Sequence, residues 1–263
     1  MKALHRLLAL ALIITLACGC SAKTDTVSAA TGPSDGEATL EPQAAPGVSS
    51  TPLATVSVDT KLKSVDTVSE ATQSRYAERE IHEYRGVRLD PAVGPADNSI
   101  NGVQYVDISG YTLRITGLAD EPQTYSYDEV LAFDAYGRLT TLYCIGGWTA
   151  TILWEGVLLT DLFDAAGIQD DANTVIFKAA DGYTTSLPRD IVEKREMILA
   201  YKSNGVDIPP EMGYPFIVVA EDKLGYKWAR WVTEIELSDD EDYLGYWEEK
   251  GYFNEANIPH NFK

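Results

Sequence analysis

One stretch decides the fold of this chain: Leu142-Tyr143-Cys144-Ile145-Gly146-Gly147-Trp148. Cys144 lies near the end of a predicted strand over residues 139–145 and directly before a Gly-Gly-Trp turn. Its residue type and position fit three roles: a soft metal ligand, a nucleophile or a buried core thiol. A free cysteine is among the residue types most often buried, so the core role is the simplest of the three. The functional question is therefore which role Cys144 has.

The N-terminus has the pattern of an export signal. The basic residues Lys2 and Arg6 precede an apolar run over residues 7–17, and the run ends in Ala17-Cys18-Gly19-Cys20. This pattern predicts a signal peptide over residues 1–19, which is too short to span a bilayer. The ending resembles a lipobox with Cys20 as the lipidated residue, and the alternative is an ordinary signal peptide with incidental cysteines. We therefore expect an extracytoplasmic protein that is anchored to the cell membrane through Cys20.

The composition changes sharply after the leader. Residues 20–75 are rich in Ser, Thr, Ala, Pro and Gly and lack aromatic side chains, which predicts a disordered linker. Residues 76–263 contain the aromatic residues and are long enough to form a single domain with a sizeable core. Only Cys144 remains in this domain, so a disulfide within it is excluded.

Charge and motif content exclude several classes of protein. The formal net charge of −19 opposes binding to nucleic acid, so we expect no nucleic-acid partner. The domain contains only His82 and His260, which are far apart, so neither a His-rich zinc site nor a Ser-His-Asp triad is indicated. The glycine patterns of P-loop and dinucleotide-binding proteins are also absent.

Hydrophobic periodicity predicts many short strands and a few helices. Ser126 and Glu129 form a capping-box pattern that predicts a helix over residues 127–135, and Gly167 should end a helix over residues 158–166. Alternation and turn signals predict strands over residues 104–108, 112–116, 139–145, 174–179, 183–187, 197–202, 206–208, 215–220 and 228–237. This mixture indicates an α+β fold.

A cluster of basic residues is the second candidate site. Lys223, Lys227 and Arg230 flank Gly225-Tyr226, and a glycine with neighbouring cations is suited to hold a phosphate. The simpler interpretation is a surface turn with solvated lysines.

The order of the motifs is more specific than any one of them. The chain resembles the molybdopterin-binding oxidoreductase domain of the sulfite oxidase type over residues of about 100–260. The motifs that carry the resemblance are Leu113-Arg114-Ile115-Thr116-Gly117-Leu118, Cys144-Ile145-Gly146-Gly147-Trp148, Trp154-Glu155-Gly156-Val157, Asp181-Gly182-Tyr183, Gly213-Tyr214-Pro215, Gly225-Tyr226-Lys227 and Gly245-Tyr246-Trp247.

The resemblance implies a single α+β domain of mixed β-sheets that binds molybdopterin with molybdenum. It places Cys144 as the sulfur ligand of the metal, Lys223, Tyr226, Lys227 and Arg230 around the pterin phosphate, and Asn98 beside the pterin. It also implies oxygen-atom or two-electron transfer on a small oxoanion or sulfoxide, with a membrane electron-transfer partner.

Two alternatives remain open from the sequence. A protein with the same fold could lack the cofactor and act as an extracytoplasmic binding or assembly module, with Cys144 in the core. A thiol redox protein that uses Cys144 alone is less favoured, because the domain contains no second cysteine to resolve an oxidised thiol.

Overall fold

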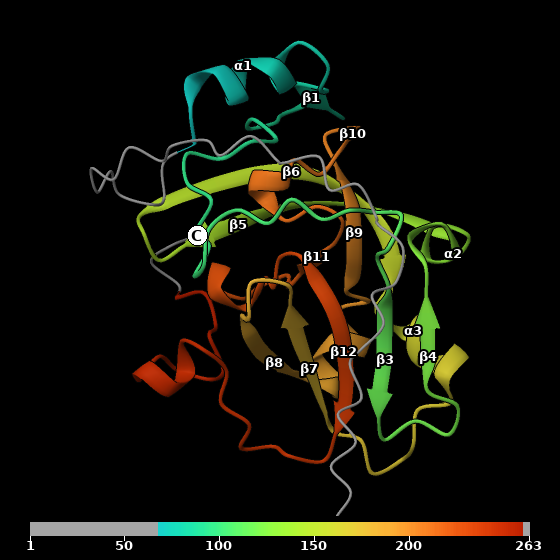
Figure 1. The fold of residues 1–263 in the computed structure, drawn as a ribbon. Coiled ribbons are helices and arrows are strands. Elements are labelled where there is room, and N and C mark those ends of the chain that lie inside the picture. The colour runs from blue at the N-terminus through green and yellow to red at the C-terminus, as the bar shows by residue number, and fades with distance from the viewer. Residues whose placement is uncertain (1–67, 260–263) are drawn as a thin grey trace, which may run out of the picture. The chain divides into compact units, whose positions relative to one another are not determined.

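The computed structural model describes residues 68–259, and their ribbon is shown in Figure 1. The predicted signal peptide, the lipidation site Cys20 and most of the predicted linker lie outside the described residues. Within residues 68–259, the chain folds into two five-stranded sheets, a small two-stranded hairpin and a few short helices. This arrangement confirms the α+β fold with mixed sheets.

The first sheet carries Cys144 at the end of one of its strands. Its strands follow the order β10-β9-β6-β5, and β11 also pairs with β9. Neighbouring strands are antiparallel, and the long β5–β6 hairpin pairs Ala135 with Val157 at one end and Cys144 with Trp148 at the other. The bounds are β5 Ala135–Cys144, β6 Trp148–Leu158, β9 Ile198–Ser203, β10 Val206–Asp207 and β11 Ile217–Val219.

The second sheet supplies the strands beneath this hairpin in Figure 1. Its order is β4-β3-β12-β7-β8, in which β12 runs parallel to β3 and antiparallel to β7, so the sheet is mixed. The bounds are β3 Leu113–Gly117, β4 Gln123–Tyr125, β7 Thr174–Ala179, β8 Thr184–Pro188 and β12 Val232–Ser238. The separate hairpin consists of β1 Glu83–Tyr84 and β2 Val87–Arg88.

The helices are short and begin or end where the sequence signals them. Ser126 and Glu129 form the predicted capping box, and Gly167 ends its helix in the left-handed conformation at φ 65°. The α-helices are α1 Glu70–Ala77, α2 Tyr127–Leu131, α3 Leu159–Ala166 and α4 Arg189–Lys194. The 3-10 helices are η1 Pro210–Met212, η2 Gly225–Lys227 and η3 Glu248–Lys250. No helix among the described residues is long and apolar enough to cross a membrane.

Three expectations about the elements need correction, and one strand has no counterpart among them. Residues 104–108 alternate like a strand but pair with no other strand in the described chain, and Tyr105 is 76% exposed. The helix that begins at Tyr127 ends at Leu131, because the chain forms β5 from Ala135 onward. The long strand β6 is not predicted by the sequence patterns. The linker boundary predicted at residue 76 falls inside α1.

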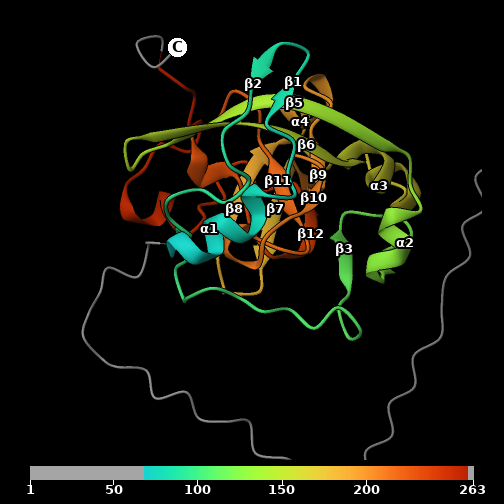
Figure 2. The ribbon, with the colours of Figure 1, turned by 90° about the horizontal axis from the view of Figure 1, so that it is seen from above.

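One hydrophobic core joins both sheets and α3. Leu113 of β3, Val157 of β6 and Phe163 of α3 belong to the same cluster of buried side chains, and α3 contacts both strands. The β1–β2 hairpin crosses over β5 and β6 (Figure 2), and after it Asp90 N donates to Thr151 O at 2.9 Å. This overlay brings the residues that follow it, 98–100, to the end of β5.

Candidate functional site

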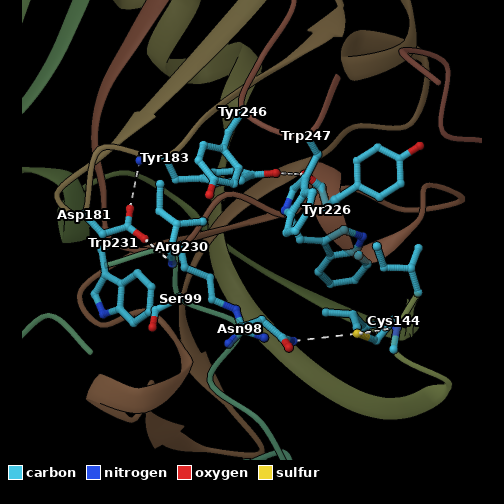
Figure 3. Close-up of a pocket in the computed structure, with 16 residues that line it drawn as sticks. Asn98, Ser99, Cys144, Asp181, Tyr183, Tyr226, Arg230, Trp231, Tyr246 and Trp247 are labelled. Atoms are coloured by element: carbon cyan, nitrogen blue, oxygen red, sulfur yellow. Dashed lines mark hydrogen bonds between the residues drawn. The ribbon is translucent and has the colours of Figure 1, made fainter. Parts of the chain in front are cut away.

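The end of β5 opens into a cavity of about 460 Å³ (Figure 3). Its wall combines the β5–β6 turn, residues 98–100, the β7–β8 turn, η2 with the residues after it, and the segment before η3. The lining residues are Asn98, Ser99, Ile100, Leu142, Cys144, Ile145, Gly146, Asp181, Tyr183, Gly225, Tyr226, Trp228, Arg230, Trp231, Tyr246 and Trp247. Segments that are far apart in the sequence therefore meet around the thiol.

Cys144 lines this cavity although it is only 8% exposed. Two hydrogen-bond donors point at its sulfur: Gly146 N lies 3.3 Å from Sγ, and Asn98 Nδ2 lies 3.7 Å from it (Figure 3). The thiol is thus held in one orientation at a cavity wall, not enclosed on all sides by apolar side chains.

Arg230 places a buried positive charge in the same cavity, where it lies next to Asn98 in Figure 3. It is 9% exposed, and its Nη1 donates to the backbone carbonyls of Asp97 and Glu211. Burial lowers the pKa of Arg230, while the Cys144 sulfur and the Asp97 carboxylate oppose that shift. Among the described residues, no carboxylate forms an ion pair with Arg230. A buried cation without an ion-pair partner is suited to receive an anionic group.

Asp181 and two tyrosines complete the polar part of the wall. Asp181 accepts hydrogen bonds from Tyr183 N at 3.0 Å and from Ile100 N at 3.4 Å, and the Tyr183 hydroxyl donates to Tyr226 O. Burial raises the pKa of Tyr183 well above its usual value and raises the pKa of Tyr226 to about 12. Both phenols therefore stay neutral near neutral pH and act as structural hydrogen-bond donors.

The structure separates the predicted site residues into two groups. Asn98, Cys144, Tyr226 and Arg230 line one cavity, as the motif order suggests. Lys223 and Lys227 do not line it and instead contact the C-terminal part of the chain. The reason is the geometry of η2: Gly225 and Tyr226 face the cavity, while the flanking lysines project away from it.

The two lysines are buried and already have partners. Lys227 has a side chain that is 0% exposed, forms an ion pair with Glu248 and donates to Asn254 Oδ1 at 2.7 Å. Lys223 donates to Glu255 O at 2.8 Å and to Asn257 Oδ1 at 2.7 Å. Burial lowers the pKa of each lysine. Their surroundings correct the prediction that they are available to a phosphate.

Several cavity residues do not stand out in the sequence as site residues. Asp181 forms part of a hairpin signal, Ser99 lies in an unremarkable loop, and Tyr246 and Trp247 belong to the motif at the end of the domain. For Asp181, Tyr246 and Trp247 the only sequence signal is membership of the motifs that carry the family resemblance, and Ser99 has none. Groups of three or more His, Cys, Asp or Glu side chains arranged to hold a metal are absent from residues 68–259. A metal here would depend on Cys144 and on ligands from a cofactor.

Known proteins share this domain. The chain is 34% identical over 149 residues to "Uncharacterized oxidoreductase YuiH" of Bacillus subtilis. The aligned region covers 56% of this chain and 75% of YuiH. It is 30% identical over 151 residues to "Putative protein-methionine-sulfoxide reductase subunit YedZ1" of Azospira oryzae, covering 57% of each chain. The sulfane dehydrogenase SoxCD of Paracoccus pantotrophus has the same fold, with a TM-score of 0.51 and 22% identity over 53% of this chain and 41% of that chain.

The family model for the oxidoreductase molybdopterin binding domain matches residues 100–247. These residues include every strand of both five-stranded sheets, Cys144 and every lining residue of the cavity except Asn98 and Ser99. The match confirms the family resemblance that the motif order indicates. The chain therefore belongs to the family of the oxidoreductase molybdopterin binding domain.

Proposed function

We propose that this protein is a molybdopterin-dependent oxidoreductase that acts on a small oxoanion or sulfoxide. The observation that carries the proposal is the position of Cys144, whose sulfur opens into a cavity that also contains the buried cation Arg230. A core thiol has no need of such a cavity or of two donors aimed at its sulfur. Membership of the family supports the same conclusion.

The residues of the cavity fit the cofactor in two respects. Cys144 offers a soft sulfur ligand of the kind that thiophilic metals select. Arg230 offers a charge to an anionic group, and Gly225 allows η2 to approach the end of β5 closely, because a Cβ atom there would lie 3.2 Å from Tyr143 O. The fit fails at Lys223 and Lys227, which are occupied by the chain itself. A phosphate would therefore be held by Arg230 and backbone N–H groups, with the lysines kept in their present contacts.

Several cavity residues then have a definite task. Cys144 would bind the metal, and Asn98 and the Gly146 N–H would hold its sulfur in place. The aromatic wall that includes Trp228, Tyr246 and Trp247 would limit access of water to the reacting atoms. The bound group would supply two-electron redox chemistry and transfer of an oxygen atom.

We further propose where the protein works. The basic and apolar leader with Cys20 supports anchoring by lipid on the extracytoplasmic side of the membrane, with the segment between Cys20 and α1 as the tether. Such a tether would keep the domain near a membrane electron-transfer partner. Mass spectrometry of the native protein for a diacylglyceryl group at Cys20 tests the anchor independently of the enzyme.

One observation favours a second candidate, a cofactor-free binding module. Glu248 forms an ion pair with Lys227, and Glu255 O and Asn257 Oδ1 accept hydrogen bonds from Lys223, as expected of a chain that no longer needs these lysines for a phosphate. In this case the cavity would bind a different small molecule, and Cys144 would be a wall residue.

Metal and pterin analysis of protein purified from its native membrane separates the two candidates. An oxidoreductase should contain molybdenum near one atom per chain together with a pterin, and the Cys144→Ser variant should lose the metal. Thr141→Ser, a conservative change on the same strand, is the matched control and should keep it. Cys144→Ser should change the free energy of unfolding by only about 1 kcal/mol, so loss of metal would not reflect misfolding. Folded native protein without molybdenum or pterin would refute the first candidate.

A further inference from the structure

The segment of residues 245–257, here called the C-terminal strap, forms one side of the Cys144 cavity. Tyr246 and Trp247 from the strap line the cavity and lie across it from Asn98 and Cys144 in Figure 3. Their rings pack edge-to-face with centroids 5.3 Å apart, and the Trp247 ring also packs on Tyr252 of the strap at 5.1 Å. Access to the thiol therefore depends on where the strap lies.

Polar contacts attach the strap to the turn around η2. Lys227 pairs with Glu248 and Asn254, and Lys223 binds Glu255 O and Asn257 Oδ1. The backbone adds bonds from Leu224 N to Ala256 O at 2.8 Å and from the Tyr226 hydroxyl to Phe253 O at 2.8 Å. Every one of these bonds joins the strap to residues 223–227.

Apolar burial holds the strap much less firmly. Phe253 is 80% exposed, and Tyr252 is also exposed. The side chain of Ala256 is buried but is too small to contribute much. Tyr246 and Trp247 pack against the core, and Tyr246 N also donates to Thr184 O at 2.9 Å, so the start of the strap is fixed on β8. After Trp247 the strap lacks a large buried apolar side chain, so the position of residues 248–257 depends mainly on the contacts with the two lysines.

The Lys227–Glu248 pair is the central contact. Both side chains are 0% exposed, and Glu248 Oε1 also accepts a hydrogen bond from Thr185 Oγ1 at 3.0 Å. Its second oxygen, Oε2, has no hydrogen-bond partner among the described residues. Removal of Lys227 would leave a buried carboxylate without its cation, and that carboxylate would be stabilised by moving into water.

We propose that Lys223 and Lys227 are positioning residues that latch the C-terminal strap, and that release of this latch opens the Cys144 cavity to incoming molecules. The latch is a property of the chain itself and does not depend on the proposed oxidoreductase activity. It gives the two lysines a role in place of phosphate binding: they act on the cavity through the wall that they hold.

The test measures how fast the Cys144 thiol reacts with N-ethylmaleimide in the metal-free protein. Mass spectrometry of the peptide that contains Cys144 excludes signal from Cys18 and Cys20. Lys227→Met should raise the rate by roughly 10-fold or more, which corresponds to about 1.4 kcal/mol in the opening equilibrium. Hydrogen exchange of residues 245–257 should increase in parallel, while exchange in β7 and β12 should not change.

Two further variants make the result specific. The double variant Lys227→Met with Glu248→Leu removes both charges together and should return the rate toward the wild-type value, because neither charge is left unpaired. Lys178→Met is the matched control: it removes a lysine that pairs with Glu234 and Glu236 on the second sheet, away from the strap. Its rate should equal that of the wild type.

Lys223→Met is the variant to test if Lys227→Met does not fold. Lys223 contacts a carbonyl and an amide oxygen, so its loss strands no charge and should give a smaller increase in the same direction. The proposal is overturned if the folded Lys223 and Lys227 variants alkylate Cys144 no faster than Lys178→Met, or if the strap exchanges no faster in them.

Discussion

Gly156 is the position where the fold should be least tolerant of a single added carbon. It lies within β6, opposite Tyr136 of β5 and Ala200 of β9, at an irregularity in the β6–β9 pairing. A Cβ atom here would lie 2.2 Å from Leu199 O and 2.5 Å from the Cα of Ala200. Contacts this short do not occur between nonbonded atoms, so Gly156→Ala must displace one strand from the other.

The cost follows from what would have to move. The atoms that clash belong to the backbone of β9, which is itself paired with β10 and β11, so a change of side-chain rotamer cannot relieve the overlap. Overpacking of a core with flexible neighbours destabilises proteins by about 1–3 kcal/mol. With rigid backbone as the neighbour, we expect the upper end, about 3 kcal/mol or more. For a domain of this size this lowers Tm by roughly 6–12 °C.

Urea denaturation of the mature chain measures this cost, and a neighbouring glycine provides the control. Gly137 of β5 lies opposite Glu155 of β6, and a Cβ atom added at Gly137 would have no atom within 4 Å. Gly137→Ala should change the free energy of unfolding by less than about 1 kcal/mol in either direction. A Gly156→Ala variant whose stability lies within 1 kcal/mol of the wild-type value would refute the close approach of β6 and β9.

Three further outcomes are expected. Asn204→Ala should destabilise the protein by about 3 kcal/mol and expose residues 78–97 to proteolysis. The fully buried Asn204 amide donates to Glu80 Oε2 at 3.0 Å and to Asp90 O at 2.8 Å, and both bonds would be lost. Urea denaturation measures the first effect and limited proteolysis the second. Ser126→Ala should cost about 1 kcal/mol in urea denaturation, because it removes the capping box of α2; a change below 0.3 kcal/mol would contradict this estimate. Tyr226→Phe should make the free energy of unfolding less sensitive to alkali, since burial raises the pKa of Tyr226 to about 12. Because the phenol ionises more easily in the unfolded chain, its contribution to stability is complete below about pH 10 and is lost as the pH rises toward 12. Urea denaturation between about pH 10 and pH 12 should show a shallower decline for the variant than for the wild type.

Local signals predict the helices and hairpins best. The capping box at Ser126 and the stop at Gly167 act within a single turn, so their effects are readable from neighbouring residues. The strand β6 is the main omission, because Glu155 and Gly156 interrupt its apolar pattern. It is a strand because β5 and β9 bind it on both edges, which is a property of its neighbours. Residues 104–108 show the converse: they alternate well but pair with no strand in the described chain.

The cavity residues divide in the same way. The motif order identifies Cys144, Asn98, Tyr226 and Arg230, and the structure brings them together. Lys223 and Lys227 are equally prominent in the sequence, yet their side chains face the other side of η2. Composition cannot indicate this direction.

The amino-acid sequence by itself determined the α+β class, the family and the thiol of the candidate site, because these depend on periodicity, turn residues and motif order along the chain. Tertiary structure alone decided which charges face the cavity. Lys227 finds Asn254 across a separation of 27 residues, whereas Arg230 donates to the carbonyl of Asp97 across 133 residues. The local chain sets where a side chain begins, but the buried partners that the fold brings within reach determine where its charge is stabilised.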